Sequence, residues 1–476
     1  MHLTSPLGVA LLVLGFTGYW LLAGKPRLQN VWLIMASMLC YGYINPIYPV
    51  VLLVVSGFAF GTAKAISRTD NEQQRSGLLA MGITFVGGSL LSLKYAHKSW
   101  SWMGDLVPVH SASGFSIVNW VAPIGLSFYV LGLIGYLVDV KRYKAKAETD
   151  PLLFIASVSF LPHLLSGPIP KHSEMLPQLR SGRRLDVATV LPAAQLIIWG
   201  LFKKLVIADN LAPAVNYCFG RYGELSGSAL LLGVVFASVQ IYADFSGYSD
   251  MAFGIARLLG INIDRNFNRP LFSRNPAQYW RNWHMSLNRW LREYLYLPLG
   301  GRTTSTTTWI VVVIAVFAFS GAWHGTGFNF ILWGLSNAAI YLVFHYGKRF
   351  FTKSAPTKGV SAIPVRFSAW VVTFYSIALT RVFFRAPNME VALGYYKRLF
   401  QLDLFTAAPE FLARYAIWCL PLFVVEALTF LQPKAAQRDV LVPARIISVL
   451  FCVAAITGIY FFQYQQDTLE YIYFRF

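Results

Sequence analysis

Apolar runs near or above the length of a membrane span recur along the whole chain. The longest are residues 6–23, 47–66, 77–93, 117–139, 228–262, 328–346, 366–384, 412–431 and 443–462. A helix needs roughly 18 to 20 such residues to cross a bilayer. Shorter stretches, at 31–44, 151–168, 190–207 and 309–322, are ambiguous. We therefore predict an all-α integral membrane protein, a helical bundle of roughly ten to twelve spans with re-entrant segments.

Charged residues are scarce, and the positive ones gather in short loops. Only 13% of the 476 residues are charged, about half the share in soluble domains. In a soluble protein the net charge of +19 could indicate a nucleic-acid partner. Here Lys and Arg concentrate at 24–30, 67–75, 141–148 and 347–353, which the positive-inside rule places in the cytoplasm. We therefore expect this charge to lie beside a lipid bilayer and not to bind nucleic acid. The amino terminus is expected to lie outside the cytoplasm.

Two basic loops, 141–148 and 171–187, are separated by one short apolar piece at 151–170. Loops on the same side need zero or two crossings between them, so this proline-interrupted piece is predicted to dip into the membrane and return. Residues 1–23 lack a basic n-region and a small-residue cleavage site, so we expect the first helix to be retained. We predict one membrane domain over 1–476. Its parts are amino-terminal helices at 1–115, a core at 116–346, and carboxy-terminal helices with an aromatic tail at 347–476.

Polar side chains interrupt the apolar run at 228–262. Gln240 and Asp244 are four residues apart and share a helical face with Tyr248. That face cannot point at lipid. Two roles of equal weight remain for Asp244. It could make a structural hydrogen bond to a neighbouring helix or an arginine, or it could support a functional site. Asp250 lies on another face, and we expect it to pair with an arginine near the membrane interface.

The first of two notable histidines lies in the longest hydrophilic segment. Residues 276–297 are predicted to form one amphipathic helix near the membrane surface, because apolar residues recur at the i, i+3, i+4, i+7 spacing. His284 lies on this apolar stripe, where a packing role is more common than catalysis, and Asn288 falls on the other side. The arginines of this segment could bind phospholipid headgroups or the phosphates of a nucleotide-containing donor. They are Arg281, Arg289 and Arg292.

The second histidine, His324, occurs in FSGAWHGTGFNFILWG at 319–334. The apolar stretch at 309–322 would be only about 20 Å long as a helix, too short for a comfortable span. Glycines flank Trp323 and His324 on both sides. A histidine at a helix break near membrane depth is allowed only around a cavity. We therefore favour a function over packing for His324.

Two such histidines are suited to acyl transfer. A neutral imidazole can remove a proton from a hydroxyl so that the oxygen attacks a thioester or ester carbonyl. We expect no metal, because the nearby acids form no ligand motif and HExxH spacing is absent. The cysteines lack CxxC spacing, which predicts neither zinc nor a disulfide framework. They are Cys40, Cys218, Cys419 and Cys452. A GxSxG elbow, a Walker A sequence and a dinucleotide fingerprint are also absent.

Several long motifs carry a family resemblance. They are PIGLSFYVLGLIGYLVDVKR (123–142), FLPHLLSGPI (160–169), YADFSGYSDMAFGIARLLGI (242–261), NFNRPLFSRNPAQYWRNWHMSLNRWLREYLYLPLGG (266–301) and WHGTGFNFILWG (323–334). Together they resemble the membrane-bound O-acyltransferase (MBOAT) family. Within it, they resemble the bacterial branch that contains alginate and peptidoglycan O-acetyltransferases and the D-alanyl transferase of teichoic acids.

The resemblance implies a helical bundle around a thin centre with a central funnel for the acyl donor. It also implies that His324 is the catalytic residue, that His284 is its companion, and that His163 lines the same region. The ending EYIYFRF (470–476) is similar to the aromatic ending of this branch. Because a phenol can carry an acyl group, we hypothesise that Tyr473 relays the acyl group by nucleophilic catalysis.

These residues lead to an expected function. We expect a multi-pass protein of the bacterial cytoplasmic membrane, with no bound cofactor, that moves an acetyl group from a cytosolic thioester towards hydroxyls of an extracytoplasmic polysaccharide. The polysaccharide is an exopolysaccharide such as alginate, or peptidoglycan. The expected donor is acetyl-CoA or an acyl carrier protein, and an extracytoplasmic acetyltransferase is a candidate partner. The alternatives are D-alanyl transfer from a carrier protein to teichoic acid, and a proton-coupled transporter.

Overall fold

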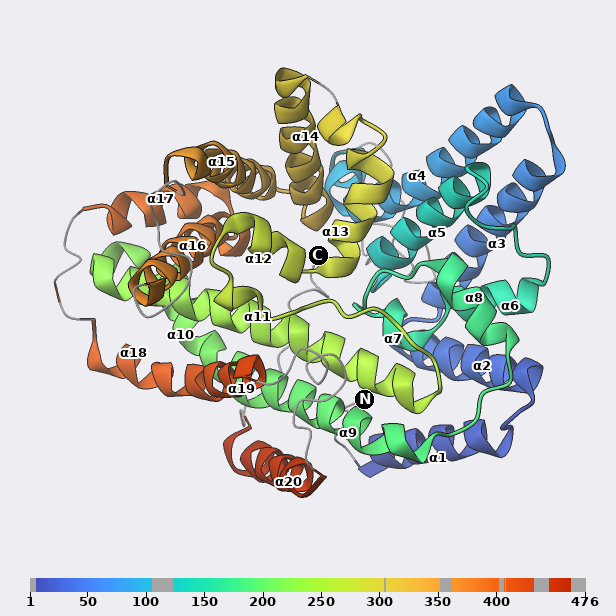
Figure 1. The fold of residues 1–476 in the computed structure, drawn as a ribbon, viewed down its shortest axis with the longest axis horizontal. Coiled ribbons are helices and arrows are strands. Elements are labelled where there is room, and N and C mark those ends of the chain that lie inside the picture. The colour runs from blue at the N-terminus through green and yellow to red at the C-terminus, as the bar shows by residue number, and fades with distance from the viewer. Residues whose placement is uncertain are drawn as a thin grey trace. The chain divides into compact units, whose positions relative to one another are not determined.

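The computed structural model describes residues 6–104, 123–303, 305–351, 362–401, 406, 408–431 and 445–463, and every regular element among them is a helix (Figure 1). Eight helices in these ranges are long and apolar enough to cross a membrane. The predicted all-α, multi-pass membrane fold is therefore confirmed. The described residues hold fewer candidate spans than the ten to twelve predicted, in part because α5 (Leu126–Lys141) has only 16 residues.

The chain divides into two compact units. The first comprises residues 1–193 and 252–264, and the second comprises 194–251 and 265–476. The predicted part boundaries at 116 and 347 stay a prediction. Two long helices begin in one unit and end in the other. They are α9 (Val187–Phe202) and α11 (Gly227–Leu258).

The first unit packs its helices around a core of aliphatic and tyrosine side chains. Its other helices are α1 (Pro6–Leu21), α2 (Pro26–Ile44), α3 (Ile47–Arg68), α4 (Glu72–Gly104), α6 (Pro151–Val158), α7 (Leu161–Leu164) and α8 (His172–Arg180). The buried Arg75 guanidinium donates to the carbonyls of Ile66 and Thr69 at the end of α3, and to those of Val140 and Lys141 at the end of α5. One side chain thus satisfies carbonyls at two helix ends, where no intrahelical donor is left. As expected, 151–170 contains no helix long enough to cross a membrane.

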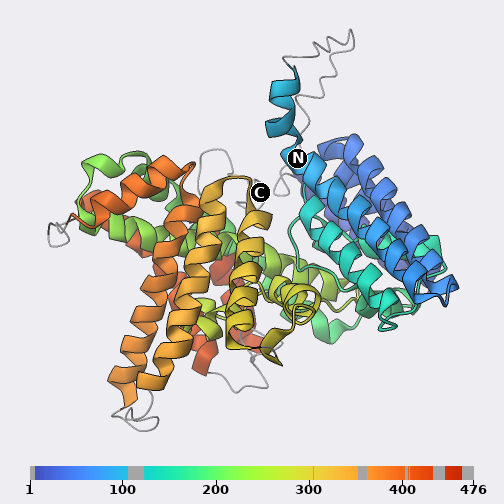
Figure 2. The same cartoon turned by 90° about the horizontal axis from the view of Figure 1, so that it is seen from above.

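The second unit contains His284 and His324. Its helices, besides parts of α9 and α11, are α10 (Asp209–Gly220), α12 (Pro276–Asn282), α13 (Met285–Leu291), α14 (Thr306–His324), α15 (Phe328–Phe351), α16 (Ala362–Arg385), α17 (Met389–Leu399), α18 (Glu410–Arg414), α19 (Leu420–Leu431) and α20 (Arg445–Phe462). Five short π or 3-10 turns join them: η2 (Lys203–Ala208), η3 (Tyr222–Glu224), η4 (Pro270–Phe272), η5 (Arg292–Tyr296) and η7 (Tyr415–Cys419), with η6 (Gly301–Thr303) before α14. Figure 2 shows α14, α15 and α16 side by side.

Two lysines of η2 neutralise the acids of α11. The Lys204 ammonium lies 2.9 Å from an Asp244 oxygen and 3.0 Å from an Asp209 oxygen. The Lys203 ammonium lies 2.6 Å from an Asp250 oxygen. The expected arginine partner of Asp250 is therefore a lysine of the adjacent helix. Buried charges need such partners, because an isolated ion is costly to remove from water.

Two predicted helices have different bounds in the structure. The predicted helix at 276–297 is broken into α12, α13 and η5, with the break at Trp283 and His284. The predicted short helix at 309–322 extends from Thr306 to His324, about 28 Å at 1.5 Å per residue, because Ser305 caps its first turn by accepting from the Thr308 N–H. The helix therefore ends at His324 itself, and the break follows at Gly325.

Candidate active site

His284 lies at a strained break between two helices. Its φ of 44° is in the left-handed region, where residues other than glycine are uncommon. The side chain of Asn288 stabilises this break, because its Nδ2 donates to the carbonyls of Trp280 at 2.7 Å and Trp283 at 2.5 Å. The sequence NWHMSLN therefore turns the His284 side chain inward instead of continuing the helix.

Asn266 determines which nitrogen of His284 carries a proton. The Asn266 Oδ1 lies 3.0 Å from His284 Nδ1, and it also accepts from the backbone N–H and the hydroxyl of Ser286. An amide oxygen can only accept, so Nδ1 is the protonated nitrogen of the neutral ring. The lone pair is then on Nε2. This is the tautomer that can accept a proton or a hydrogen bond at Nε2.

The surroundings of His284 favour its neutral form. The side chain is 1% exposed, and its ring packs edge-on against Phe245 with centroids 4.8 Å apart. Desolvation by burial lowers the pKa of His284 to about 3. The imidazolium form is therefore disfavoured at neutral pH.

His324 is the last residue of α14 and is also buried. Its ring packs against Trp333 of α15 and Phe384 of α16, with centroids 5.1 and 5.4 Å apart. The ring of Trp323 contacts both histidines, at 4.8 Å from His324 and 6.1 Å from His284. The structure thus places the two predicted catalytic histidines around one shared tryptophan.

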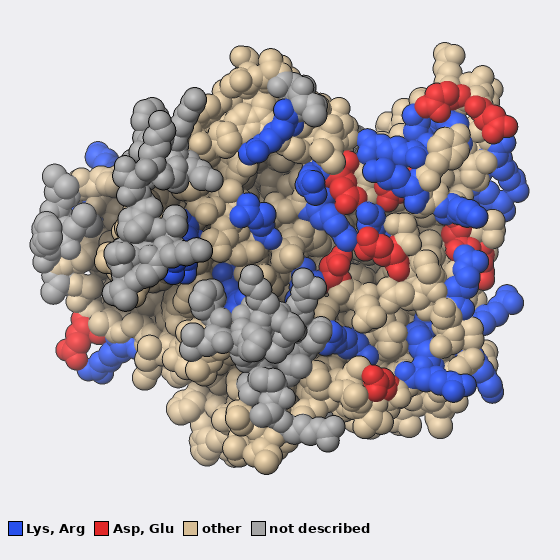
Figure 3. All heavy atoms as spheres, in the orientation of Figure 1, with Lys and Arg blue, Asp and Glu red and all other residues tan. Residues whose placement is uncertain are grey.

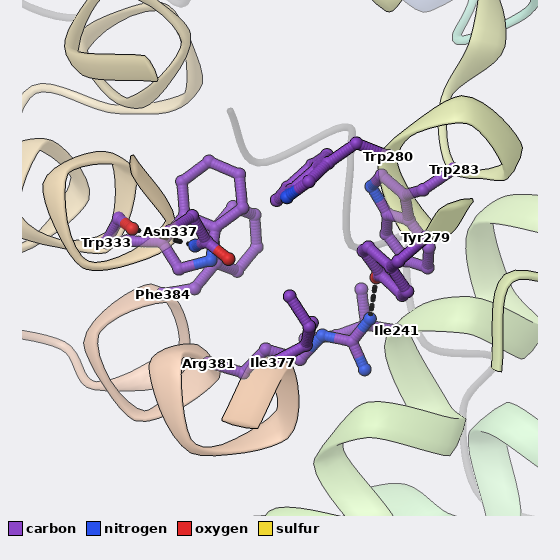
Figure 4. Close-up of a pocket in the computed structure, with 9 residues that line it drawn as sticks. All are labelled: Ile241, Tyr279, Trp280, Trp283, Trp333, Asn337, Ile377, Arg381 and Phe384. Atoms are coloured by element: carbon purple, nitrogen blue, oxygen red, sulfur yellow. Dashed lines mark hydrogen bonds between the residues drawn. The ribbon is translucent and has the colours of Figure 1, made fainter. Parts of the chain in front are cut away.

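A small cavity lies next to the rings that pack against His324 (Figure 4). Its volume of about 10 Å³ is close to what one water molecule needs. Trp333 and Phe384, the two rings that contact His324, form one wall of it. The remaining lining residues are Ile241, Tyr279, Trp280, Trp283, Asn337, Ile377 and Arg381.

The remaining predicted site residues are divided between the two units. The buried Asp244 contacts Lys204, as described above, and Gln240 of the same helix is 7% exposed. His163 belongs to the first unit, where its Nδ1 donates to the Pro168 carbonyl at 2.5 Å. Tyr473 lies outside the described residues.

The three predicted donor-binding arginines are at or near the surface. Arg281 and Arg292 are exposed, and Arg289 is half-buried. On the face drawn in Figure 3, more of the surface is coloured for Lys and Arg than for Asp and Glu. Such positions suit headgroup or phosphate contacts equally well, so the donor-binding role of these arginines stays a prediction.

Several buried charges near the site were missed by reasoning from the sequence. Arg381 lies inside the span Ile363–Arg385, Lys203 and Lys204 lie inside Val187–Gly220, and Glu426 lies inside Glu410–Thr429. Each could have been identified from the sequence, because an ionisable residue within a membrane span indicates a functional or paired group. Among the residues that the structure describes, no three His, Cys, Asp or Glu side chains gather closely enough to hold a metal ion.

Comparisons with known proteins identify the family. The family model for the membrane-bound O-acyltransferases matches residues 112–384. A peptidoglycan O-acetyltransferase of Helicobacter pylori is 32% identical over 85% of this chain and 82% of its own length. The probable alginate O-acetylase AlgI of Pseudomonas aeruginosa is 31% identical over 81% of this chain and 72% of its own.

A third relative is less similar to this chain. A teichoic acid D-alanyltransferase of Bacillus subtilis is 24% identical over 57% of this chain and 70% of its own length. The family match includes both buried histidines, the helix break at His284 and the cavity beside His324. The protein is a multi-pass member of the membrane-bound O-acyltransferase family and an O-acyltransferase.

Proposed function

We propose that the protein transfers an acetyl group from a cytosolic thioester to hydroxyls of an extracytoplasmic polysaccharide, either an exopolysaccharide such as alginate or peptidoglycan. The observation that carries this proposal is the pair of buried histidines around Trp323, one of them with its Nδ1 hydrogen-bonded to Asn266. The names of the two more similar relatives support acetyl as the acyl group. The proposed location is the cytoplasmic membrane of a bacterium.

His324 acts as the general base in this proposal. It takes the hydroxyl proton while the hydroxyl oxygen forms a bond to the thioester carbonyl carbon. The carbon–sulfur bond then breaks, and the imidazolium returns its proton to the leaving thiolate. The imidazole is neutral again at the end of the cycle, and the products are an ester and a thiol.

His284 assists by accepting a hydrogen bond. Its lowered pKa makes it a weak proton acceptor at neutral pH, so a positioning role fits it better than that of the base. Asp244 supports the site from α11, where its contact with Lys204 holds the two helices together. The donor is acetyl-CoA or an acyl carrier protein, and an extracytoplasmic acetyltransferase that completes the transfer is the proposed partner.

The test uses purified protein, radiolabelled acetyl-CoA and a soluble glycan acceptor. His324→Gln should lower acetyl transfer about 10² to 10⁴-fold, as expected for loss of a general base. The matched control is His345→Gln, the same exchange at an exposed histidine of the neighbouring helix α15, which should retain activity. Near-full transfer by His324→Gln at equal expression would refute the assignment.

The same assay separates the alternative functions. Labelling that needs D-alanine on a carrier protein, without any from acetyl-CoA, would favour the D-alanyl transferase named among the relatives. A proton-coupled transporter would give neither acetyl transfer nor thioester hydrolysis. Loss of acetyl groups from one cell glycan in a deletion strain would identify the acceptor.

We also propose that Tyr473 carries the acyl group between donor and acceptor. In that step the phenol oxygen attacks the thioester carbonyl, the thiol leaves, and the acceptor hydroxyl later displaces the phenol. Tyr473→Phe should abolish transfer to glycan, whereas Tyr471→Phe in the same ending serves as control. Undiminished glycan acetylation in cells that carry Tyr473→Phe would exclude the relay.

A further inference from the structure

Arg381 is a buried cation at the cavity beside His324. It is 5% exposed and lies within a membrane-spanning helix. Its guanidinium donates to the Ser238 carbonyl and to the Tyr279 hydroxyl, and it lies 4.8 Å from the Trp283 ring centroid. No carboxylate in the described ranges lies within ion-pair distance of it. A guanidinium has five N–H donors, so it retains donors for an additional acceptor.

Trp280 places a second donor at the same cavity. Its Nε1 is buried and has no hydrogen-bond acceptor in the part of the chain that the structure describes. In Figure 4 its indole extends from α12 into the space between Trp333 and Phe384 on one side and Tyr279 and Trp283 on the other. Buried N–H groups without an acceptor are rare in folded proteins and call for an explanation.

The cavity walls limit what can satisfy these donors. The lining is aromatic and aliphatic apart from Arg381, Asn337 and the polar atoms of Tyr279 and the tryptophans. Asn337 donates to the Trp333 carbonyl and to the Thr380 hydroxyl, so its amide N–H groups are used within the protein. The space is narrow and offers donors without an acid. It therefore suits a small group that presents an oxygen acceptor, preferably one that gains negative charge.

We propose that Trp280 and Arg381 form the binding site for the acyl oxygen of the thioester. This inference rests on the proposed acetyl transfer. Trp280 Nε1–H and a guanidinium N–H of Arg381 donate to the carbonyl oxygen, and they stabilise the negative charge that this oxygen gains when the hydroxyl attacks. His324, whose ring packs against the lining residues Trp333 and Phe384, receives the hydroxyl proton.

Two coenzyme A thioethers test this site by binding. S-acetonyl-CoA carries a ketone oxygen, and S-propyl-CoA has the same chain length without it. The wild-type protein should bind S-acetonyl-CoA at least about tenfold more tightly, as expected for a hydrogen bond to a charged group. Trp280→Phe and Arg381→Lys should each remove most of this preference and lower kcat for acetyl transfer more than they raise KM.

A matched control separates this role from a structural one. Trp370 Nε1 donates to the Leu271 carbonyl at 2.7 Å, so Trp370→Phe should lower Tm but keep the preference for the ketone. Trp280→Phe loses similar ring packing, but the donor it removes has no acceptor among the described residues. Its Tm should therefore fall less than that of Trp370→Phe while the preference is lost. A Tm loss in Trp280→Phe with the ketone preference intact would overturn the inference.

The wild-type result distinguishes the two proposals. Equal binding of both analogues by the wild-type protein would refute the acyl-oxygen site and leave the proposed acetyl transfer standing. Binding of neither analogue would refute the coenzyme A donor, and the acyl-oxygen site with it. A ketone preference in the wild type that both variants lose supports the site.

Discussion

At the scale of single residues, the identity of a hydrogen-bond partner determines what each histidine can do. His284 is neutral because it is buried, and Asn266 selects its tautomer. His172 of α8 is a comparable case in the first unit, because it is buried beside the Ser157 hydroxyl and burial lowers its pKa to about 3. Neither partner could be predicted from the sequence, since Asn266 and Ser157 are 18 and 15 residues from these histidines along the chain and face them only in the folded structure.

These two histidines predict a loss of stability in acid. The ordinary pKa of a histidine is about 6.5, so the unfolded chain binds their protons below that pH, while the folded protein binds them only near pH 3. Stability is therefore fully present above about pH 6.5 and falls as the pH falls towards 3. Each histidine should contribute a loss of about 1.4 kcal/mol per pH unit.

The measurement is the apparent Tm of the protein in detergent between pH 7.5 and pH 4.5. His172→Gln is the informative variant, because it removes one of the two proton-binding groups and lies outside the proposed reacting pair. Its Tm should fall less on acidification than that of the wild type. An identical acid dependence in both proteins would show that His172 is not held neutral in the fold.

At the scale of helices, apolar length predicted the long spans well and the breaks poorly. The long runs at 47–66, 328–346 and 366–384 each correspond to one membrane-spanning helix. The continuous helix at 276–297 was wrong, because its spacing pattern carries no information about the Asn288 side chain that stabilises the break at Trp283 and His284. Local periodicity describes which face is apolar, whereas a break depends on contacts that compete with the helix.

Intramembrane charges are the other feature that the apolar runs concealed. Lys203, Lys204 and Arg381 each lie in a stretch whose average hydropathy still permits a span. Their positions could have been identified one by one from the rule that such residues need partners. Which partners they take could not, because Lys204 contacts Asp244 only where α9 and α11 lie close together.

Close approach of α9 and α11 leads to a prediction at this scale. A methyl group on Gly247 would lie 2.7 Å from the Gly200 carbonyl oxygen, closer than carbon and oxygen can pack. Gly247→Ala should separate the helices, weaken the lysine–aspartate contacts next to it, and destabilise the protein by about 1 to 3 kcal/mol. The readout is Tm together with acetyl transfer.

Gly57 of α3 provides the matched comparison. It is also inside a membrane-spanning helix, but nothing lies within 4 Å of the position of an added methyl group. Gly57→Ala should leave Tm unchanged or raise it slightly, because alanine favours the helix more than glycine does. Equal Tm values for both alanine variants would mean that the helices can separate at Gly247 without cost.

At the scale of the whole molecule, the charge pattern predicts on which side of the membrane each loop lies. The helix bounds alone do not. The two basic loops at 141–148 and 171–187 are both assigned to the cytoplasm, with 151–170 between them. Helices α6 and α7 in that piece have 8 and 4 residues, far fewer than the roughly 20 needed for a span. The side on which each loop lies remains a prediction, and it decides which face of the membrane meets the donor.

Single cysteines that react with a membrane-impermeant maleimide test this topology. Of the four native cysteines only Cys40 is exposed, so Cys40→Ser provides the background. Lys144→Cys and Arg184→Cys, both at exposed positions, should label only after the cells are permeabilised. Tyr43→Cys, near the end of α2 and 70% exposed, should label in intact cells. If Lys144→Cys and Arg184→Cys label from opposite sides, 151–170 crosses the membrane, and the cytoplasmic assignment of one basic loop is wrong.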